Sequence, residues 1–297
     1  MIKNTNDGTQ AAPYLRVDMN YGGCNDLPYF SKGPKGDDRN KHTAIQEAGF
    51  KGFQDGDPAL CKELGLELTA HARMNEVGDL DDLLPKWKDG GYNCATLHVG
   101  WGMEPDAEMD RLVEYVLNSS VKFDLPIYIE THRATITQDL WRTVELTKRF
   151  PEIRFNGDFS HWYTGQEMVY GGIENKWEFI QPVFDRVRFM HGRIGNPGCI
   201  QVDIGNGENQ SYVEHFKEMW TRAFLGFLKS AEAGDYICFT AELLQADIFY
   251  ARTVKNAPGE EQEEGDRWQQ ALLYKEIAEG CWKEAIARVK KIEQREK

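Results

Sequence analysis

The sequence has few of the features that mark secreted or membrane-bound proteins. Its 297 residues include only six cysteines, which are scattered and form no CxxC pair, so a disulfide framework is not expected. No apolar run approaches the roughly 18 residues of a membrane span, and residues 1–13 lack the apolar core of a secretory signal. These absences predict a reduced, cytoplasmic protein with no membrane partner.

Basic residues are also scarce. The chain has 35 Lys and Arg against 48 Asp and Glu, which leaves a net charge of −13. Binding to a phosphate backbone needs a basic face, so the composition argues against broad nucleic-acid binding. Hydrophobic residues make up 41% of the chain and aromatic residues 12%, which is enough for a large core and excludes disorder of the whole chain.

Short apolar runs alternate with segments of helical periodicity. Within the latter, apolar residues recur at i, i+3, i+4 and i+7, as over residues 109–116. Eight such β-then-α units predict a closed (β/α)8 TIM barrel, an α/β fold, in a single domain over residues 1–297. An open doubly wound sheet is the rival, but Tyr21-Gly22-Gly23-Cys24 after the first strand does not match the GxGxxG turn. The eight predicted strands are residues 14–18, 50–54, 66–71, 93–98, 126–130, 153–158, 187–191 and 236–242.

Three segments fall outside a minimal barrel. Residues 1–12 are polar and are expected to be a flexible N-terminal segment. Residues 20–40 and 253–266 are long, and each follows a strand, so both are expected to be extended loops on the catalytic face. The second loop contains the acidic run of residues 260–264, which we expect to be solvated.

Ionisable residues end nearly all of the predicted strands, and the C-terminal strand ends of a barrel converge on one mouth. Gln54 is the exception, and the other seven ends are Asp18, His71, His98, Glu130, Asp158, His191 and Glu242. The last four of these stand on four consecutive strands, and their carboxylates would repel one another without a cation. We therefore predict that Glu130, Asp158, His191 and Glu242 bind one divalent metal ion. The donor set suits Mn²⁺, Mg²⁺ or Co²⁺, with Zn²⁺ as a less favoured option.

Further polar and aromatic residues lie near these strand ends. His161 follows Asp158 by three residues and Arg193 follows His191 by two, and both are predicted to bind substrate hydroxyls or an enolate oxygen. The predicted substrate-binding set also includes His71, His98 and Trp101. Two sets have a second interpretation: Trp162 and Tyr163 are either a wall for a sugar ring or ordinary packing, and His132 and Arg133 either support the ligands or lie on the surface.

Four motifs carry a resemblance to a known family: Ile129-Glu130-Thr131-His132, Asp158-Phe159-Ser160-His161, His191-Gly192-Arg193 and Ala241-Glu242. With them the chain resembles the xylose isomerase-like TIM barrels, which include ketose 3-epimerases, sugar isomerases, dehydratases and endonuclease IV-type DNA repair enzymes. The resemblance is close over the last four strands and loose over the whole barrel. Residues 191–198 look like a subgroup described broadly as sugar phosphate isomerase/epimerase.

This resemblance implies roles for residues of the four motifs. It implies that Glu130, Asp158, His191 and Glu242 bind one divalent metal, and that Glu130 and Glu242 are also the acid/base pair. It implies that His161 and Arg193 contact substrate. Dimers are common in the family, so a homo-oligomer is compatible with the resemblance.

The leading hypothesis is a metal-dependent isomerase or epimerase of a sugar or keto-sugar. The metal would chelate a carbonyl and a neighbouring hydroxyl, and would stabilise the enediolate formed when Glu130 or Glu242 removes the adjacent proton. Loss of a β-substituent from the same intermediate would instead give a lyase or dehydratase. An endonuclease IV-like phosphodiesterase would use His71 and His98 in a three-metal site, but Gly205 stands where that branch needs a histidine. A non-catalytic barrel that binds a sugar or a partner is the remaining alternative.

Overall fold

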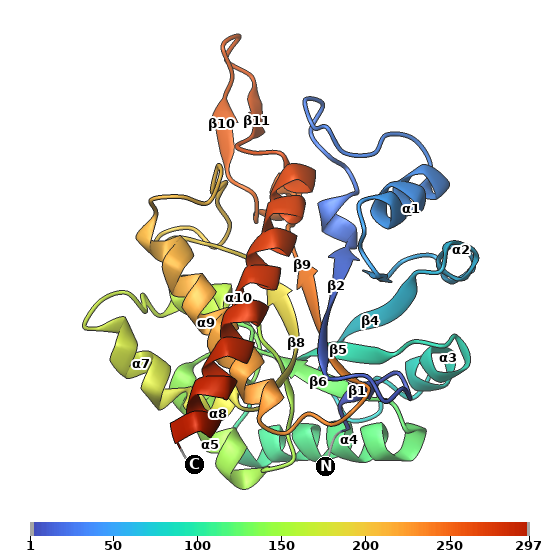
Figure 1. Ribbon diagram of the computed structural model, residues 1–297, viewed down its shortest axis with the longest axis vertical. Coiled ribbons are helices and arrows are strands. Elements are labelled where there is room, and N and C mark those ends of the chain that lie inside the picture. The colour runs from blue at the N-terminus through green and yellow to red at the C-terminus, as the bar shows by residue number, and fades with distance from the viewer. Residues whose placement is uncertain (1–2, 296–297) are drawn as a thin grey trace.

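The computed structural model describes residues 3–295 and is a closed barrel of eight parallel strands (Figure 1). Each strand pairs with the next along the chain, and the last pairs with the first to close the ring. Each of the eight barrel strands overlaps one of the eight predicted stretches, so the predicted single (β/α)8 barrel is confirmed. The barrel strands are β2 (Tyr14–Asn20), β3 (Gly52–Gln54), β4 (Glu67–Met74), β5 (Cys94–Val99), β6 (Ile127–Glu130), β7 (Phe155–Asn156), β8 (Val187–Gly192) and β9 (Asp235–Ala241).

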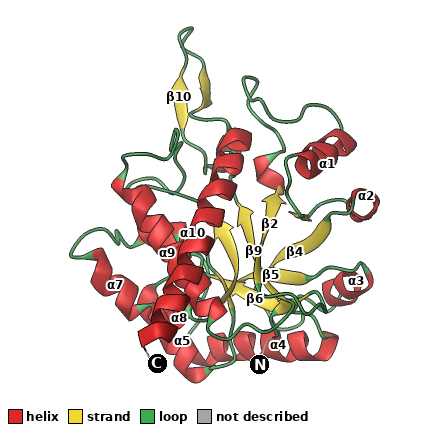
Figure 2. Cartoon of the chain, viewed as in Figure 1, coloured by secondary structure: helices red, strands yellow, loops and turns green. Residues whose placement is uncertain are grey.

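Helices surround the barrel and bury its outer face (Figure 2). Their starts follow local capping chemistry: Asp57 accepts a hydrogen bond from the Leu60 amide ahead of α2, and Asp139 accepts one from the Arg142 amide ahead of α5. Two short 3₁₀ turns, η1 (Tyr21–Gly23) and η2 (Ala246–Ile248), follow β2 and β9. The helices are α1 (Asp38–Glu47), α2 (Pro58–Leu64), α3 (Leu83–Asp89), α4 (Asp106–Phe123), α5 (Leu140–Arg149), α6 (Ser160–Gly165), α7 (Ile173–Phe179), α8 (Gln181–Phe184), α9 (Ser211–Leu228) and α10 (Arg267–Arg295).

The N-terminal segment, expected to be flexible over residues 1–12, contains one short strand. Thr5 and Asn6 form β1 (Thr5–Asn6), which pairs antiparallel with β9 at the N-terminal end of the barrel. The Thr5 side chain is buried, and its amide donates to the Tyr128 hydroxyl at 3.1 Å. The segment therefore lies beside the start of β9, near the N label in Figure 1, while residues 1–2 lie outside the described part.

The two long loops follow β2 and β9, so both lie at the face of the barrel formed by the C-terminal strand ends (Figure 1). Residues 253–266 include an antiparallel hairpin of β10 (Thr253–Lys255) and β11 (Glu261–Glu263). The acidic run expected to be a solvated loop thus forms one strand of this hairpin. Its Glu263 is mostly buried and pairs with Arg267 at 2.8 Å, because the start of α10 brings that guanidinium beneath the hairpin.

The inside of the barrel is partly polar. Asp18, predicted at the mouth, instead lies one layer deeper and pairs with the Arg16 guanidinium at 2.8 Å. The reason is that β2 continues to Asn20, so Asn20 and not Asp18 faces the mouth.

All six cysteines are free thiols. Among the described helices, none combines the length and apolar character needed to cross a bilayer.

Candidate metal centre

Four strand ends bring Glu130, Asp158, His191 and Glu242 to one point inside the mouth of the barrel. Each of the four side chains is buried and offers one ligand atom, and these atoms all lie within 4.8 Å of one another. His191 is central, with its Nδ1 3.1 Å from Glu130 Oε2 and 3.4 Å from Glu242 Oε1. The predicted set of metal ligands is therefore a cluster in space.

Arg193 links two of these carboxylates. Its Nη2 lies 2.7 Å from Asp158 Oδ2 and also donates to Glu242 Oε2. Its Nε and Nη1 are buried and have no hydrogen-bond partner among the described residues. Burial raises the pKa of Asp158, but Arg193 and His161 outweigh it and hold that pKa below the ordinary value. Burial also raises the pKa of Glu242, and there it wins over His191 and Arg193.

The orientation of His191 is fixed by a chain of amides. Its Nε2–H donates to Gln54 Oε1 at 2.9 Å, and the side-chain Nδ2 of Asn20 donates to the same oxygen at 2.9 Å. Gln54 is fixed in turn because its Nε2 donates to the Thr96 hydroxyl at 3.2 Å. These contacts hold Nε2 in its protonated form, so Nδ1 is the nitrogen that faces Glu130 and Glu242.

This arrangement fits a metal ion. His191 Nδ1 is fully buried and has no hydrogen-bond partner among the described residues, although two carboxylates face it. Burial lowers the pKa of His191, but Glu242 and Glu130 raise it to about 9, so a proton occupies Nδ1 at neutral pH. A divalent cation bound by the same three side chains and Asp158 would take the place of that proton.

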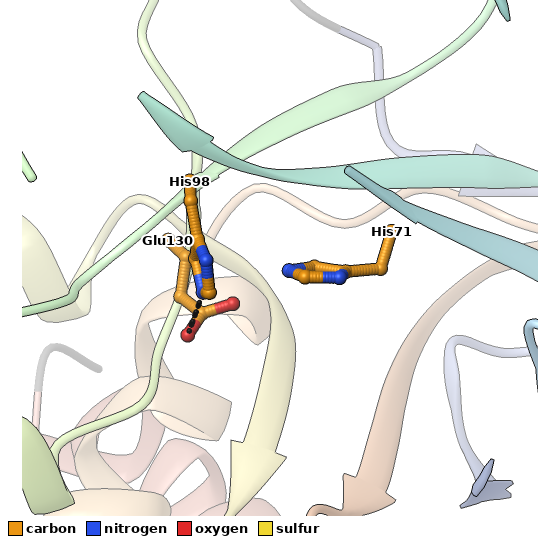
Figure 3. Close-up of side chains that lie close together, drawn as sticks. All are labelled: His71, His98 and Glu130. Carbon is orange, nitrogen blue, oxygen red and sulfur yellow. Dashed lines mark hydrogen bonds and ion pairs between the residues drawn. The ribbon is translucent and has the colours of Figure 1, made fainter. Parts of the chain in front are cut away.

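A row of further imidazoles lies near Glu130 and begins at its Oε1, whereas His191 faces its Oε2. His98 Nε2 lies 3.1 Å from Glu130 Oε1, and the His71 ring packs edge-on against His98 at 4.5 Å between centroids (Figure 3). His132 packs between His98 and His161, with centroids 4.1 and 3.9 Å away. Burial lowers the pKa of His71 to about 3 and of His132 to about 2, so both are neutral at pH 7.

Glu130 is shared by three groups of donors. Besides the four-residue cluster, ligand atoms of His71, His98 and Glu130 lie within 4.8 Å of one another, and so do those of Glu130, His132 and His161. His71 and His98 were predicted as substrate contacts, and as metal ligands only in the phosphodiesterase alternative. Because neutral imidazole nitrogens are metal ligands, the donors around Glu130 suit more than the single ion that the sequence predicts.

The remaining predicted contacts divide into two kinds. His161 is buried with neither ring nitrogen hydrogen-bonded among the described residues, and its Nε2 lies 3.3 Å from Asp158 Oδ2. Trp101 is 53% exposed, and the Arg73 guanidinium covers its ring at 4.6 Å. Trp162 and Tyr163 do not form a sugar wall, because both are buried and bond to Thr137 O and His215 Nδ1.

Three residues near the cluster were not in the predicted site. Gln54 positions His191, and Asn156 bonds both Glu130 Oε2 at 3.0 Å and the His191 amide at 2.9 Å. Tyr250 covers the Arg193 guanidinium at 4.5 Å. Gln54 and Asn156 stand at or near strand ends, so the convergence rule alone could have found them. Tyr250 lies in the loop after β9, where no sequence pattern marks it.

Comparison with known proteins identifies no family for this chain. No protein-family model matches the chain, and no curated protein matches it. Among solved structures, the probable 3-DHS dehydratase AsbF of Bacillus anthracis is 13% identical with a TM-score of 0.49, and the match covers 78% of this chain and 94% of that one. A thermostable mutant of the xylanase Xyn10A of Cellvibrio japonicus is 10% identical with a TM-score of 0.46, covering 90% and 97%.

A dihydrodipicolinate synthase is 9% identical with a TM-score of 0.45, and the match covers 93% of this chain and 79% of that one. Similarities of this degree carry no argument about the activity of this chain. The function must therefore be argued from the site's own geometry.

Proposed function

We propose that the protein is a divalent-metal-dependent isomerase or epimerase of a sugar or keto-sugar, which moves a proton next to a carbonyl. The observation that carries this proposal is the buried cluster of Glu130, Asp158, His191 and Glu242 at the mouth of the barrel. The partner is then a small molecule, and a cytoplasmic location agrees with six free cysteines. A homo-oligomer stays a prediction from the resemblance to the xylose isomerase-like family.

Charge balance supports a divalent metal at this cluster. Three carboxylates carry three negative charges, and the Arg193 guanidinium balances one of them. The two charges that remain are those of one divalent cation, bound by oxygens and one imidazole. Such a donor set suits Mn²⁺, Mg²⁺ or Co²⁺, and Zn²⁺ is compatible. When bound, the metal would act as a Lewis acid on the substrate carbonyl.

Glu130 and Glu242 are the proposed acid/base pair. Burial raises the pKa of Glu130, but His98 and His191 outweigh it and bring that pKa well below the ordinary value, so Glu130 is ionised. In the metal-free protein burial raises the pKa of Glu242, but a bound divalent cation would favour the ionised form of both glutamates. One of the two glutamates then removes the proton and the other returns it, and such catalysis contributes about 10²–10⁴-fold.

Arg193 and His161 are placed to bind the oxygen on which negative charge develops. Two N–H groups of Arg193 and both ring nitrogens of His161 are buried without hydrogen-bond partners among the described residues. Buried donors fixed in advance stabilise an oxyanion more strongly than water does. His71, His98 and Trp101 are the proposed outer contacts of the substrate.

The first experiment measures metal content by mass spectrometry in protein purified without added metal or chelator, followed by deuterium uptake from D₂O into a panel of ketoses. We expect about one Mn, Co, Mg or Zn per chain, loss of metal in Glu242→Gln, and exchange only in the metal-loaded wild type. Glu114→Gln, on the exposed face of α4, is the matched control and should behave as the wild type.

The outcomes separate the alternatives. Exchange accompanied by release of a leaving group would identify a lyase or dehydratase with the same site. Two or three zinc ions per chain, with cleavage of abasic DNA, would support the phosphodiesterase alternative. Full metal content and full exchange in Glu242→Gln would show that Glu242 has been assigned wrongly.

A further inference from the structure

A second polar hollow lies at the opposite end of the barrel from the metal cluster. It has a volume of about 470 Å³ and lies where the N-terminal segment meets the starts of β7, β8 and β9. Arg188 at this end and His191 at the mouth are three residues apart on β8, or about 10 Å at the rise of a strand. The residues around the hollow are Lys3, Asn4, Asn6, Arg154, Arg188, Ser230, Glu232 and Asp235.

Arg154 is the unusual member of this group. Its side chain is 7% exposed, and its hydrogen bonds are made by Nη1 alone, to Pro151 O at 3.1 Å and Ile153 O at 2.7 Å. Its Nε is buried and has no hydrogen-bond partner within residues 3–295. No carboxylate of the described chain lies within 4.0 Å of it. A buried charge without a counter-ion is costly, and buried charges are therefore usually paired.

Arg188 lies beside the same hollow and is also unpaired. Its side chain is 3% exposed, and all of its hydrogen bonds go to neutral oxygens. The two acceptors that belong to side chains are Asn4 Oδ1 at 2.7 Å and Ser230 Oγ at 2.8 Å. Burial, and then the charge of Arg154, lower the pKa of Arg188 to about 10. The two guanidiniums thus add positive charge to one buried region.

The acidic residues of the hollow do not neutralise these arginines by contact. Asp235 accepts hydrogen bonds from Asn4 Nδ2 at 2.7 Å, from Asn6 Nδ2 at 2.7 Å and from the Glu232 amide at 2.9 Å. The remaining cation, Lys3, pairs with Asp124 at 2.6 Å outside the hollow. The unmet requirement is therefore for an anion beside the Arg154 guanidinium.

We propose that this hollow binds an oxyanion, the phosphate or carboxylate group of a small metabolite, with Arg154 as its main ligand. A guanidinium offers parallel N–H donors that match both groups. Arg188 adds charge from the adjoining strand, and Asn4, Asn6 and Ser230 add neutral polar groups. The site is independent of the metal cluster, since it lies at the other end of the strands.

The test compares thermal unfolding of the metal-free protein in sodium phosphate, sodium malonate and sodium chloride at equal ionic strength. A ligand that binds only the folded state raises Tm with its concentration. We expect phosphate or malonate to raise the Tm of the wild type by about 2–4 °C over chloride, and to leave Arg154→Gln within error of its chloride value. A response to phosphate alone would identify a phosphate site, and a response to malonate alone a carboxylate site.

Arg149→Gln is the matched control. The Arg149 guanidinium, in the last turn of α5, pairs with Asp110 at 2.8 Å and does not line the hollow. Arg149→Gln removes the same charge, so this control should keep the anion response. An equal loss of the anion-induced rise in Tm in both variants would show that the anions respond to general positive charge and not to a site. The absence of any anion response in the wild type would overturn the proposal. If Arg154→Gln does not fold, calorimetric titration of the wild type with phosphate and malonate gives the same decision.

Discussion

Gln54 is the residue whose removal tests most directly how the metal cluster is built. Replacing it with Leu removes the acceptor that holds His191 Nε2–H, so the imidazole can rotate and its Nδ1 is no longer held toward Glu130 and Glu242. Loss of a partner that orients a metal-ligating histidine typically costs 10–100-fold in metal affinity, or about 1.4–2.7 kcal/mol. Gln54 bonds Nε2 of His191, whereas Nδ1 is the nitrogen that faces the carboxylates, so the expected loss acts through the orientation of His191.

The assay is competition between the protein and a chelator of known affinity, with the bound metal measured directly. Gln54→Glu is the contrasting variant, because it keeps an acceptor for His191 Nε2–H and adds a negative charge beside the site. We expect Gln54→Leu to lose at least tenfold in affinity and Gln54→Glu to bind metal at least as tightly as the wild type. If Gln54→Leu binds metal as tightly as the wild type, or if both variants lose equally, the proposed control of the His191 tautomer is wrong.

Three further predictions follow from the cluster and its surroundings. The pKa of His191 in the folded, metal-free protein is raised from 6.5 to about 9, so its stabilising effect is complete below pH 6.5 and is lost as pH rises through 9. The free energy of unfolding, measured with urea, should therefore decrease by roughly 3 kcal/mol between pH 6 and 9.5. Metal loading should remove this decrease. Asp18→Ala leaves the buried Arg16 unpaired, so it should cost about 3–5 kcal/mol of stability while metal content per chain, by mass spectrometry, stays at the wild-type value. Gly192→Ala would place a Cβ 2.0–2.8 Å from the Phe239 ring, so a drop in Tm of several degrees is expected from about 1–3 kcal/mol of overpacking; an unchanged Tm would show that the ring moves aside freely.

The barrel and the four-residue cluster were predictable because both depend on periodic, local signals. Each strand is a short apolar run between turn residues, and each helix repeats its apolar positions at 3.6-residue spacing. Once eight such units are counted, the parallel topology brings every C-terminal strand end to one mouth. Glu130, Asp158, His191 and Glu242 then meet without any knowledge of the loops, since each stands on a strand end or within two residues of one.

The errors come from the length of strands and from contacts between residues far apart in sequence. The strand β2 continues two residues beyond its predicted end, so Asp18 lies in the layer below the mouth. There the Arg16 guanidinium balances its charge. Gln54 contacts His191 across 137 positions of the chain, and the pairing of β1 with β9 joins residues separated by about 230. Such contacts depend on closure of the barrel, so no window of the sequence contains them.

Closure of the barrel also explains why the cluster is charged although it is buried. Three strands contribute one carboxylate each to the cluster, and within residues 3–295 one guanidinium, that of Arg193, pairs with them. In the metal-free protein the raised pKa of His191 keeps a proton on the imidazole, so the fold itself supplies a second positive charge at neutral pH. The same nitrogen cannot hold a proton and a metal ion together. Metal affinity should therefore rise with pH up to about 9, by at most about tenfold per pH unit for a single displaced proton. A metal affinity that does not change between pH 6 and 9 would mean that His191 Nδ1 is not a ligand.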